Sequence, residues 1–107
     1  MWIVTNDYDL KMAEGDYGIE LPIKISGFSL GASDVVAIVI KKAENGDLIL
    51  TKLFSNIQQN TIKLEFTAEE SALLPIGTYV YRMDAYQEGN YLCNLVPSAS
   101  LKVVDVA

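Results

Sequence analysis

The sequence predicts an all-β protein folded as an antiparallel β-sandwich of about seven strands. Apolar and polar residues alternate with a period of two in several short segments, which is the pattern of strands with one buried face. Turn-forming residues separate these segments about every 8–12 residues, and no amphipathic helix long enough for a parallel crossover is present. The 107 residues, 50% hydrophobic and 21% charged, predict one sandwich domain over residues 1–107.

The start of the chain predicts two strands at the border of a sheet. Residues 2–5 form the expected first strand. Alternation over residues 19–25 predicts another, in which Pro22 has no amide hydrogen to donate. Proline inside sheets is confined to edge strands and bulges, so we expect an edge strand or a bulge there.

A hairpin is predicted next. The β-branched run at residues 35–42 predicts a central strand that is covered on both faces. Asn45 and Gly46 tolerate positive φ, which a tight hairpin turn requires at both central positions. Leu48–Phe54 is therefore expected as the return strand.

One helical turn is expected between the later strands. Residues 62–66 alternate and predict a strand. Thr67 and Glu70 then match a capping box, in which a hydroxyl and a carboxylate satisfy the first free amides of a helix. This pattern predicts a short helical turn near residues 68–74.

Three strands complete the predicted sandwich. Residues 77–86 read as a long strand that places Tyr79, Tyr81, Met83 and Ala85 on one face. Glu88-Gly89-Asn90 predicts a turn. Two further strands are expected on either side of a break at Pro97-Ser98, over residues 91–96 and 99–106.

The order Leu74-x-x-Gly77-x-Tyr79-x-Tyr81 resembles the tyrosine corner of immunoglobulin-like sandwiches. In those proteins a tyrosine hydroxyl ties a crossover back to the sheet. The resemblance places Tyr81 where that family carries its second cysteine. It implies an immunoglobulin-like version of the sandwich.

The composition argues against several classes of function. Eight Lys and Arg against 14 Asp and Glu give a net charge of −6, which disfavours binding to nucleic acid or to an anionic membrane. No histidine is present, and the single Cys93 can form no disulfide within this sequence. Phosphate-binding, dinucleotide-binding and nucleophile-elbow motifs are absent. We therefore expect a non-enzymatic protein with no catalytic residue and no cofactor.

The acidic N-terminal segment is the one pattern that resembles a metal site. It contains Asn6, Asp7, Asp9, Glu14 and Asp16, and oxygen ligands at alternate positions suit calcium. The ligand order of an EF-hand loop is absent, so we interpret this segment as a solvated acidic loop and expect no bound metal.

Aromatic residues supply the candidate interface. Tyr79 and Tyr81 are expected in the core or the corner, whereas other tyrosines could anchor a protein partner or stack on sugars. Trp2 either packs the first strand onto the core or contacts a partner subunit. The candidate interface residues are Trp2, Tyr17, Pro22, Tyr86 and Tyr91.

Several segments in order resemble one protein family. Gly15-Asp16 precedes Leu21-Pro22, and Asp34 precedes the strand that ends in Lys41-Lys42. The sequence Thr67-Ala68-Glu69-Glu70-Ser71 then leads into the tyrosine motif. This order resembles small immunoglobulin-like proteins of phages and prophages of Gram-positive bacteria, and among them the N-terminal domains of baseplate upper proteins. Ala37-Ile38 and Ser71 are mild departures from the family pattern.

The resemblance implies a virion structural protein that attaches or assembles parts of a tail or baseplate. Its partners would be other virion proteins and further copies of itself, bound through residues 2–5 or 19–25 as edge strands. It also implies synthesis in the bacterial cytoplasm without a signal peptide, followed by incorporation into the virion. The alternative is a carbohydrate-binding or adhesion module that uses Trp2, Tyr86 and Tyr91.

Overall fold

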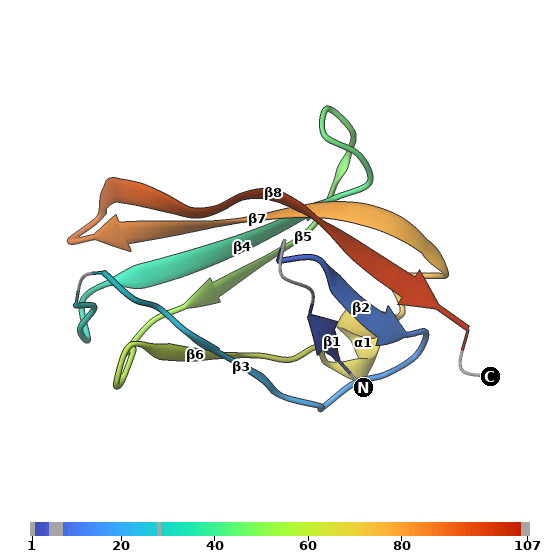
Figure 1. The fold of residues 1–107 in the computed structure, drawn as a ribbon, viewed down its shortest axis with the longest axis horizontal. Helices are drawn as coiled ribbons and strands as arrows, with labels where there is room; N and C mark the ends of the chain where they lie inside the picture. Colours follow the sequence, from blue (N-terminus) through green and yellow to red (C-terminus); the bar gives the residue numbers. More distant parts are fainter. Residues whose placement is uncertain (1, 5–7, 28, 106–107) are drawn as a thin grey trace.

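The computed structural model describes residues 2–4, 8–27 and 29–105, with only the backbone of Ile3 and Val4. A six-stranded sheet in the order β1-β2-β8-β7-β4-β5 lies over a two-stranded sheet of β3 and β6 (Figure 1). The elements are β1 (Ile3–Val4), β2 (Leu10–Ala13), β3 (Leu21–Lys24), β4 (Val35–Lys41), β5 (Leu48–Phe54), β6 (Thr61–Leu64), α1 (Ala68–Ser71), β7 (Gly77–Gln87) and β8 (Asn90–Val104). The predicted all-β sandwich is confirmed.

The core lies between the two sheets. Alternate residues of each strand point into it, because successive side chains of a strand lie on opposite faces. On β7 these are Tyr79, Tyr81, Met83 and Ala85, which share one face as predicted and are all buried. The remaining fully buried aliphatic side chains include Val36, Ile38, Ile40, Leu64, Leu74, Leu101 and Val103.

The capping box and the tyrosine corner are both present. The Glu70 amide donates to Thr67 Oγ1 over 3.1 Å, and Glu70 Oε1 accepts from the Thr67 amide over 2.9 Å. Tyr79 donates its hydroxyl hydrogen to the carbonyl oxygen of Pro75 over 2.6 Å, which ties the connection after α1 to the start of β7. The order β8-β7-β4-β5 is also that of the larger sheet in variable-type immunoglobulin domains.

The first strands differ from the prediction. The strand expected at residues 2–5 is the short β1, and Thr5 lies outside the described residues. β2 was not predicted, although Leu10 and Met12 are buried and alternate with Lys11. β2 runs parallel to β8, whereas the other paired strands are antiparallel, as predicted.

The predicted tight turn at Asn45-Gly46 is wrong. The Lys42 amide donates to the Asp47 carbonyl over 3.0 Å, so residues 43–46 form a longer loop. Neither Asn45 nor Gly46 has positive φ. Glycine is needed at position 46 for space, because a Cβ there would lie 2.9 Å from the Ala43 amide nitrogen. At the other hairpin, Glu88 and Gly89 do have positive φ, of 51° and 83°.

The predicted break at Pro97-Ser98 is also wrong, since β8 continues through it. Tyr81 pairs with Ala99 and Met83 with Val96, so Pro97 and Ser98 together lie opposite Arg82 as a bulge. A bulge leaves residues outside the ladder, and proline can occupy such a position without leaving a hydrogen bond unmade.

Candidate interaction face

One face of the six-stranded sheet points away from β3 and β6, and we call this the outer face. β4 was predicted to be covered on both faces. On its outer face Ala37 is buried, but Val35, Val39 and Lys41 are only half-buried, so that face is covered incompletely. The outer-face residues used below are Lys11, Val39, Lys41, Leu53, Val80, Arg82, Asp84, Tyr86, Tyr91, Asn94 and Lys102. An uncovered antiparallel sheet usually turns polar residues to water, so the valines here are unusual.

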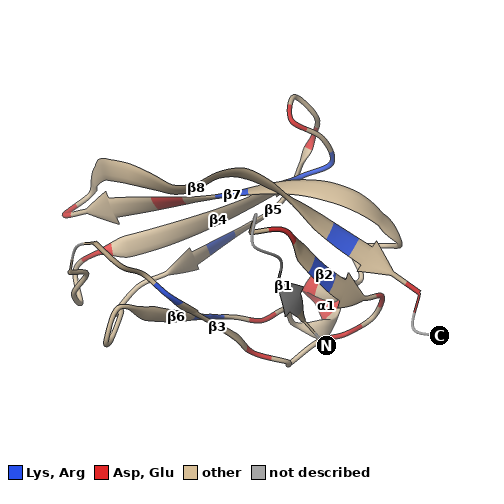
Figure 2. Cartoon of the chain, in the orientation of Figure 1, with Lys and Arg blue, Asp and Glu red and all other residues tan. Residues whose placement is uncertain are grey.

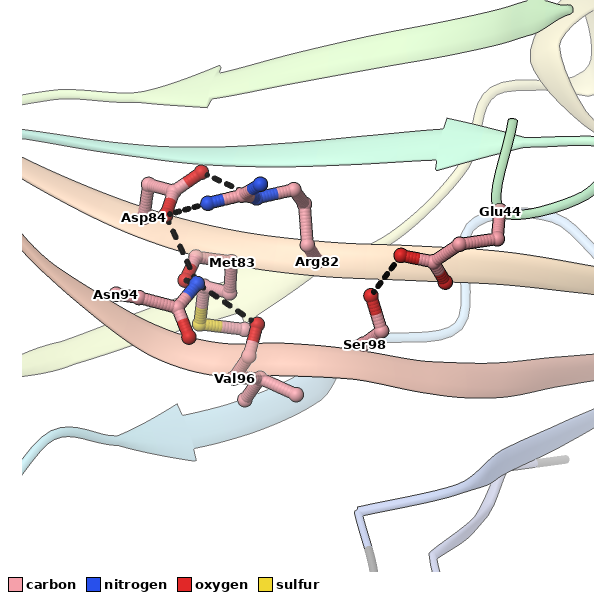
Figure 3. A network of polar contacts seen from close by, with 7 residues as sticks. All are labelled: Glu44, Arg82, Met83, Asp84, Asn94, Val96 and Ser98. Atoms are coloured by element: carbon pink, nitrogen blue, oxygen red, sulfur yellow. Dashed lines mark hydrogen bonds and ion pairs between the residues drawn. The ribbon is translucent and has the colours of Figure 1, made fainter. Parts of the chain in front are cut away.

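A polar network holds the centre of the outer face. Arg82 Nε and Nη2 each donate to one oxygen of Asp84 over 2.9 Å, which is a bidentate ion pair (Figure 3). Asn94 Nδ2 donates to Asp84 Oδ1 over 2.9 Å and also to the backbone carbonyls of Met83 and Val96. The network fixes the guanidinium of Arg82 against Asp84, while the Arg82 side chain stays 46% exposed.

Asp84 stays ionised in this network although it is only 5% exposed. Burial opposes its ionisation, but hydrogen bonds from Arg82, Asn94 and Tyr91 and the charge of Arg82 outweigh burial and lower its pKa. Asp84 in turn raises the pKa of Arg82. The centre of the face therefore carries a neutralised ion pair.

A hollow lies beside this network, at the base of the loop that joins β4 to β5. Ser98 donates its hydroxyl hydrogen to Glu44 Oε1 over 3.1 Å, so the loop is linked to β8 across the face (Figure 3). Val39, Lys41, Glu44, Val80, Tyr81, Arg82 and Ser98 line the hollow. Its walls combine the aliphatic Val39 and Val80 with Lys41, Glu44 and the paired Arg82, which suits an apolar side chain of a protein partner.

The predicted interface residues lie in three separate places. Tyr86 and Tyr91 pair across β7 and β8 on the outer face, with ring centroids 5.7 Å apart in an edge-to-face arrangement. Trp2 and Tyr17 lie together elsewhere, around a small pocket that also includes Phe66. Pro22 lies on β3, which has β6 as a neighbour on one side, so the predicted edge position is correct.

Trp2 is engaged within its own chain. Its indole nitrogen donates to the Ile19 carbonyl over 2.9 Å, and its ring lies 5.7 Å from that of Phe66. The structure thus supports the interpretation that Trp2 packs the first strand onto the core.

The acidic N-terminal segment is not a simple solvated loop, because β2 runs through it. Asp9 Oδ1 accepts from the Ser100 amide over 2.9 Å, and Glu14 Oε2 accepts from the Ile76 amide over 3.2 Å. Asn6 and Asp7 lie outside the described residues. Within the described ranges, no three His, Cys, Asp or Glu side chains are grouped so that they could hold a metal ion.

The chain matches no protein family model, no curated protein and no solved structure. In the part of the chain that the structure covers, no helix is long and apolar enough to cross a membrane.

The Arg82–Asp84–Asn94 network was not predicted from the sequence. Arg82 and Asp84 could have been found, because their spacing puts both on one face of a predicted strand and an acid inside a β-strand is unusual. Nothing in the pattern pointed to Asn94 as their partner.

Proposed function

We propose that this chain is a non-enzymatic structural protein of a phage or prophage particle, an attachment or assembly domain of its tail or baseplate. The proposal joins two lines of support. The order of motifs resembles that of the baseplate family, and the outer face has the composition of a protein interface. The face is the observation that carries the proposal.

The outer face suits protein association for three reasons. Val39 is paired with Arg82 across the ladder and Val80 lies two residues before Arg82 on the same face, and arginine and tyrosine are enriched at the energetic centres of interfaces. Leu53 is 69% exposed, which is costly for a side chain with no partner. The ion pair of Arg82 and Asp84 is already formed, so little side-chain ordering remains to be done on binding.

The proposal is tested by incorporation into particles. Purified particles of the phage or prophage that encodes the chain should contain it at a fixed ratio to the other tail proteins, as measured by quantitative mass spectrometry. Leu53→Glu places a charge on the outer face at an exposed position and should reduce incorporation at least about tenfold. Lys63→Glu, an exposed position on the smaller sheet, is the matched control and should enter particles normally.

Both variants should keep the circular dichroism spectrum and melting temperature of the wild type, since both positions are exposed. Absence of the chain from purified particles would refute the proposal. Equal incorporation of Leu53→Glu and wild type would show that the outer face is not the attachment surface.

A carbohydrate-binding module is the second candidate, and one observation favours it. Tyr86 and Tyr91 lie beside Asp84 and Asn94, so aromatic rings and hydrogen-bonding groups occur together. Binding of the wild type to host cell-wall glycans on an array, lost in Tyr91→Ala, would support this candidate. Signals at background level for both would remove it.

A further inference from the structure

Basic and acidic side chains occupy different parts of the described fold. Every Lys and Arg except Lys42 lies in a strand, whereas Asp84 is the one acid within a described strand. The other described acids lie in turns, loops and α1, and many gather at the end of the molecule that holds α1 and β1 (Figure 2). A chain of net charge −6 therefore has sheet surfaces that are locally basic.

The outer face carries several of the basic side chains. Lys11 and Lys102 are adjacent in the parallel pair of β2 and β8, and Lys41 lines the hollow. Asp84, the only acid within the described strands, neutralises Arg82, so Lys11, Lys41 and Lys102 supply the uncompensated positive charge of the face. Glu44, on the loop beside the hollow, is the acid nearest to Lys41 in its lining. Aliphatic side chains lie among these cations.

The opposite charge gathers around α1, at a surface that we call the acidic end. The acidic end comprises Glu14, Glu20, Glu65 and Glu69 together with the exposed apolar residues Tyr17, Ile19, Leu73 and Ile76. Two hydrogen bonds hold its segments together: the Gly18 amide donates to the Phe66 carbonyl over 2.8 Å, and the Ile76 amide donates to Glu14. The four apolar side chains are between 44% and 61% exposed.

We propose that the outer face of one copy of this chain binds the acidic end of a second copy. Both surfaces combine exposed apolar side chains with charges, and the charges have opposite sign, so each compensates the other on contact. Two outer faces brought together would oppose cations to cations, and two acidic ends would oppose acids to acids. The contact is therefore head-to-tail.

A head-to-tail contact between identical chains repeats. It closes into a ring when the rotation between copies allows and otherwise grows as a filament. This inference rests on the proposed function and deepens it, because repeated copies in a ring or a fibre are what a tail or baseplate assembly needs. Three of the five predicted interface residues fit this contact, since Tyr17 lies on the acidic end and Tyr86 and Tyr91 on the outer face.

The first test is the molar mass of the purified chain by sedimentation equilibrium, from about 1 µM to about 1 mM. At low salt the mass should rise above the 11.8 kDa of one chain as the concentration increases. Raising the salt from about 50 mM to about 500 mM should weaken association about tenfold or more, because exposed charges are screened. A monomer throughout the low-salt series would overturn the proposal.

The second test uses two charge-reversed double variants. Lys41→Glu with Lys102→Glu reverses charge on the outer face, and Glu20→Lys with Glu69→Lys reverses it on the acidic end. Each variant alone should stay monomeric, because its two surfaces now carry the same sign. An equimolar mixture should associate, since the basic face of one variant meets the acidic end of the other.

Lys24→Glu with Lys63→Glu is the matched control for the outer-face variant, because it makes the same change in net charge at exposed positions on the smaller sheet. It should associate more like the wild type than either reversed variant does. Self-association of the acidic-end variant at wild-type strength would overturn the proposal, because it would mean a contact between two outer faces.

The two proposals can fail separately. A chain that stays monomeric at low salt but still enters particles, and loses entry on Leu53→Glu, refutes the head-to-tail contact and leaves the proposed function intact. A chain that passes the mixing test but is absent from purified particles has the contact without the proposed function.

Discussion

Asp84 shows how a single residue shapes the outer face. An ionised carboxylate on an apolar sheet would normally hold water and repel an apolar partner. Here Arg82, Asn94 and Tyr91 use its lone pairs, so the charge is neutralised within the chain. Arg82 gains a fixed orientation in exchange, and its aliphatic stem stays available for contact.

The tyrosine corner gives a prediction for one hydroxyl group. Tyr79→Phe removes the hydrogen bond to Pro75 and nothing else of the ring, so the free energy of unfolding should fall by about 0.5–1.5 kcal/mol. Tyr17→Phe, at a residue that is 61% exposed, is the control and should change it by less than about 0.5 kcal/mol. Urea denaturation measures both, and equal midpoints for Tyr79→Phe and wild type would contradict the structural role.

For single residues, the sequence predicted well which face of a strand a side chain lies on, but it predicted poorly which residue lies opposite it on the next strand. The alternation on β7 correctly divided its side chains between two faces of the sheet. The partner of Asp84 was beyond reach, because a regular ladder counted back from the Glu88-Gly89 turn would place Cys93 opposite it. A bulge at Leu92 shifts the register, so that Asp84 pairs with Asn94.

In the loop between β4 and β5, Gly46 is expected to matter because a larger side chain has no room there, and not because its φ is positive. In Gly46→Ala the new Cβ would lie 2.9 Å from the Ala43 amide nitrogen, so the loop has to move. We expect the melting temperature to fall by several degrees, for a cost of about 1–2 kcal/mol.

The control for that change is Gly31→Ala, where the nearest atom to a new Cβ is Asp34 Oδ2 at 4.0 Å. Its φ is not positive, so alanine fits there and should leave the melting temperature the same or slightly higher. Thermal denaturation followed by circular dichroism compares the two. A Gly46→Ala protein as stable as Gly31→Ala would mean that the loop is not held as described.

Elements with local signals were predicted best. The capping box marked α1, and β5 has the predicted bounds because its alternation and its loop are local features. β2 escaped notice because the acids around it favoured a loop, while its place in the sheet depends on β8, far along the chain. Pro97 was taken as a break because a proline signal cannot distinguish a strand end from a bulge.

The stability of the whole molecule should depend on pH at both extremes. Burial, with the nearby Asp9 and Tyr8, raises the pKa of Tyr81 from 10.0 to about 12. A raised pKa means that the contribution is complete below about pH 10 and is lost as the pH rises through about 12. The shift corresponds to about 2–3 kcal/mol, and Tyr81→Phe should make stability less dependent on pH in this range.

The acid side has the opposite sign. Burial opposes the ionisation of Glu70, but hydrogen bonds from Lys52 and Thr67 outweigh it and lower the pKa, and the pKa of Asp84 is lowered as well. These contributions are complete above the ordinary values of 4.5 and 3.8 and are lost as the pH falls through the lowered ones. Melting temperatures measured from about pH 2 to about pH 12 should therefore form a plateau that falls at both ends. A flat profile at either end would contradict the corresponding assignment.

For the whole molecule, the sequence predicted the all-β class and the tyrosine corner, but not how the strands are divided between the two sheets. Periodicity shows that a strand has a buried face, yet it does not say which strands share a sheet. The six-to-two division leaves the outer face uncovered, and it depends on β1 and β2 joining β8 rather than β3. Contacts between segments far apart in the sequence decide which strands β1 and β2 pair with, and local sequence patterns do not reveal such contacts.

The parallel pairing of β2 with β8 also has a consequence for how the protein is made. Asp9 and Ser100, which hydrogen-bond beside this pair, are 91 residues apart in the chain. Because a ribosome makes β2 long before β8, Leu10 and Met12 must remain without their final neighbours while nearly all the rest of the sandwich is synthesised. Closing so long a loop is slow, so the nascent chain would present this apolar strand to chaperones or to other nascent chains until β8 emerges.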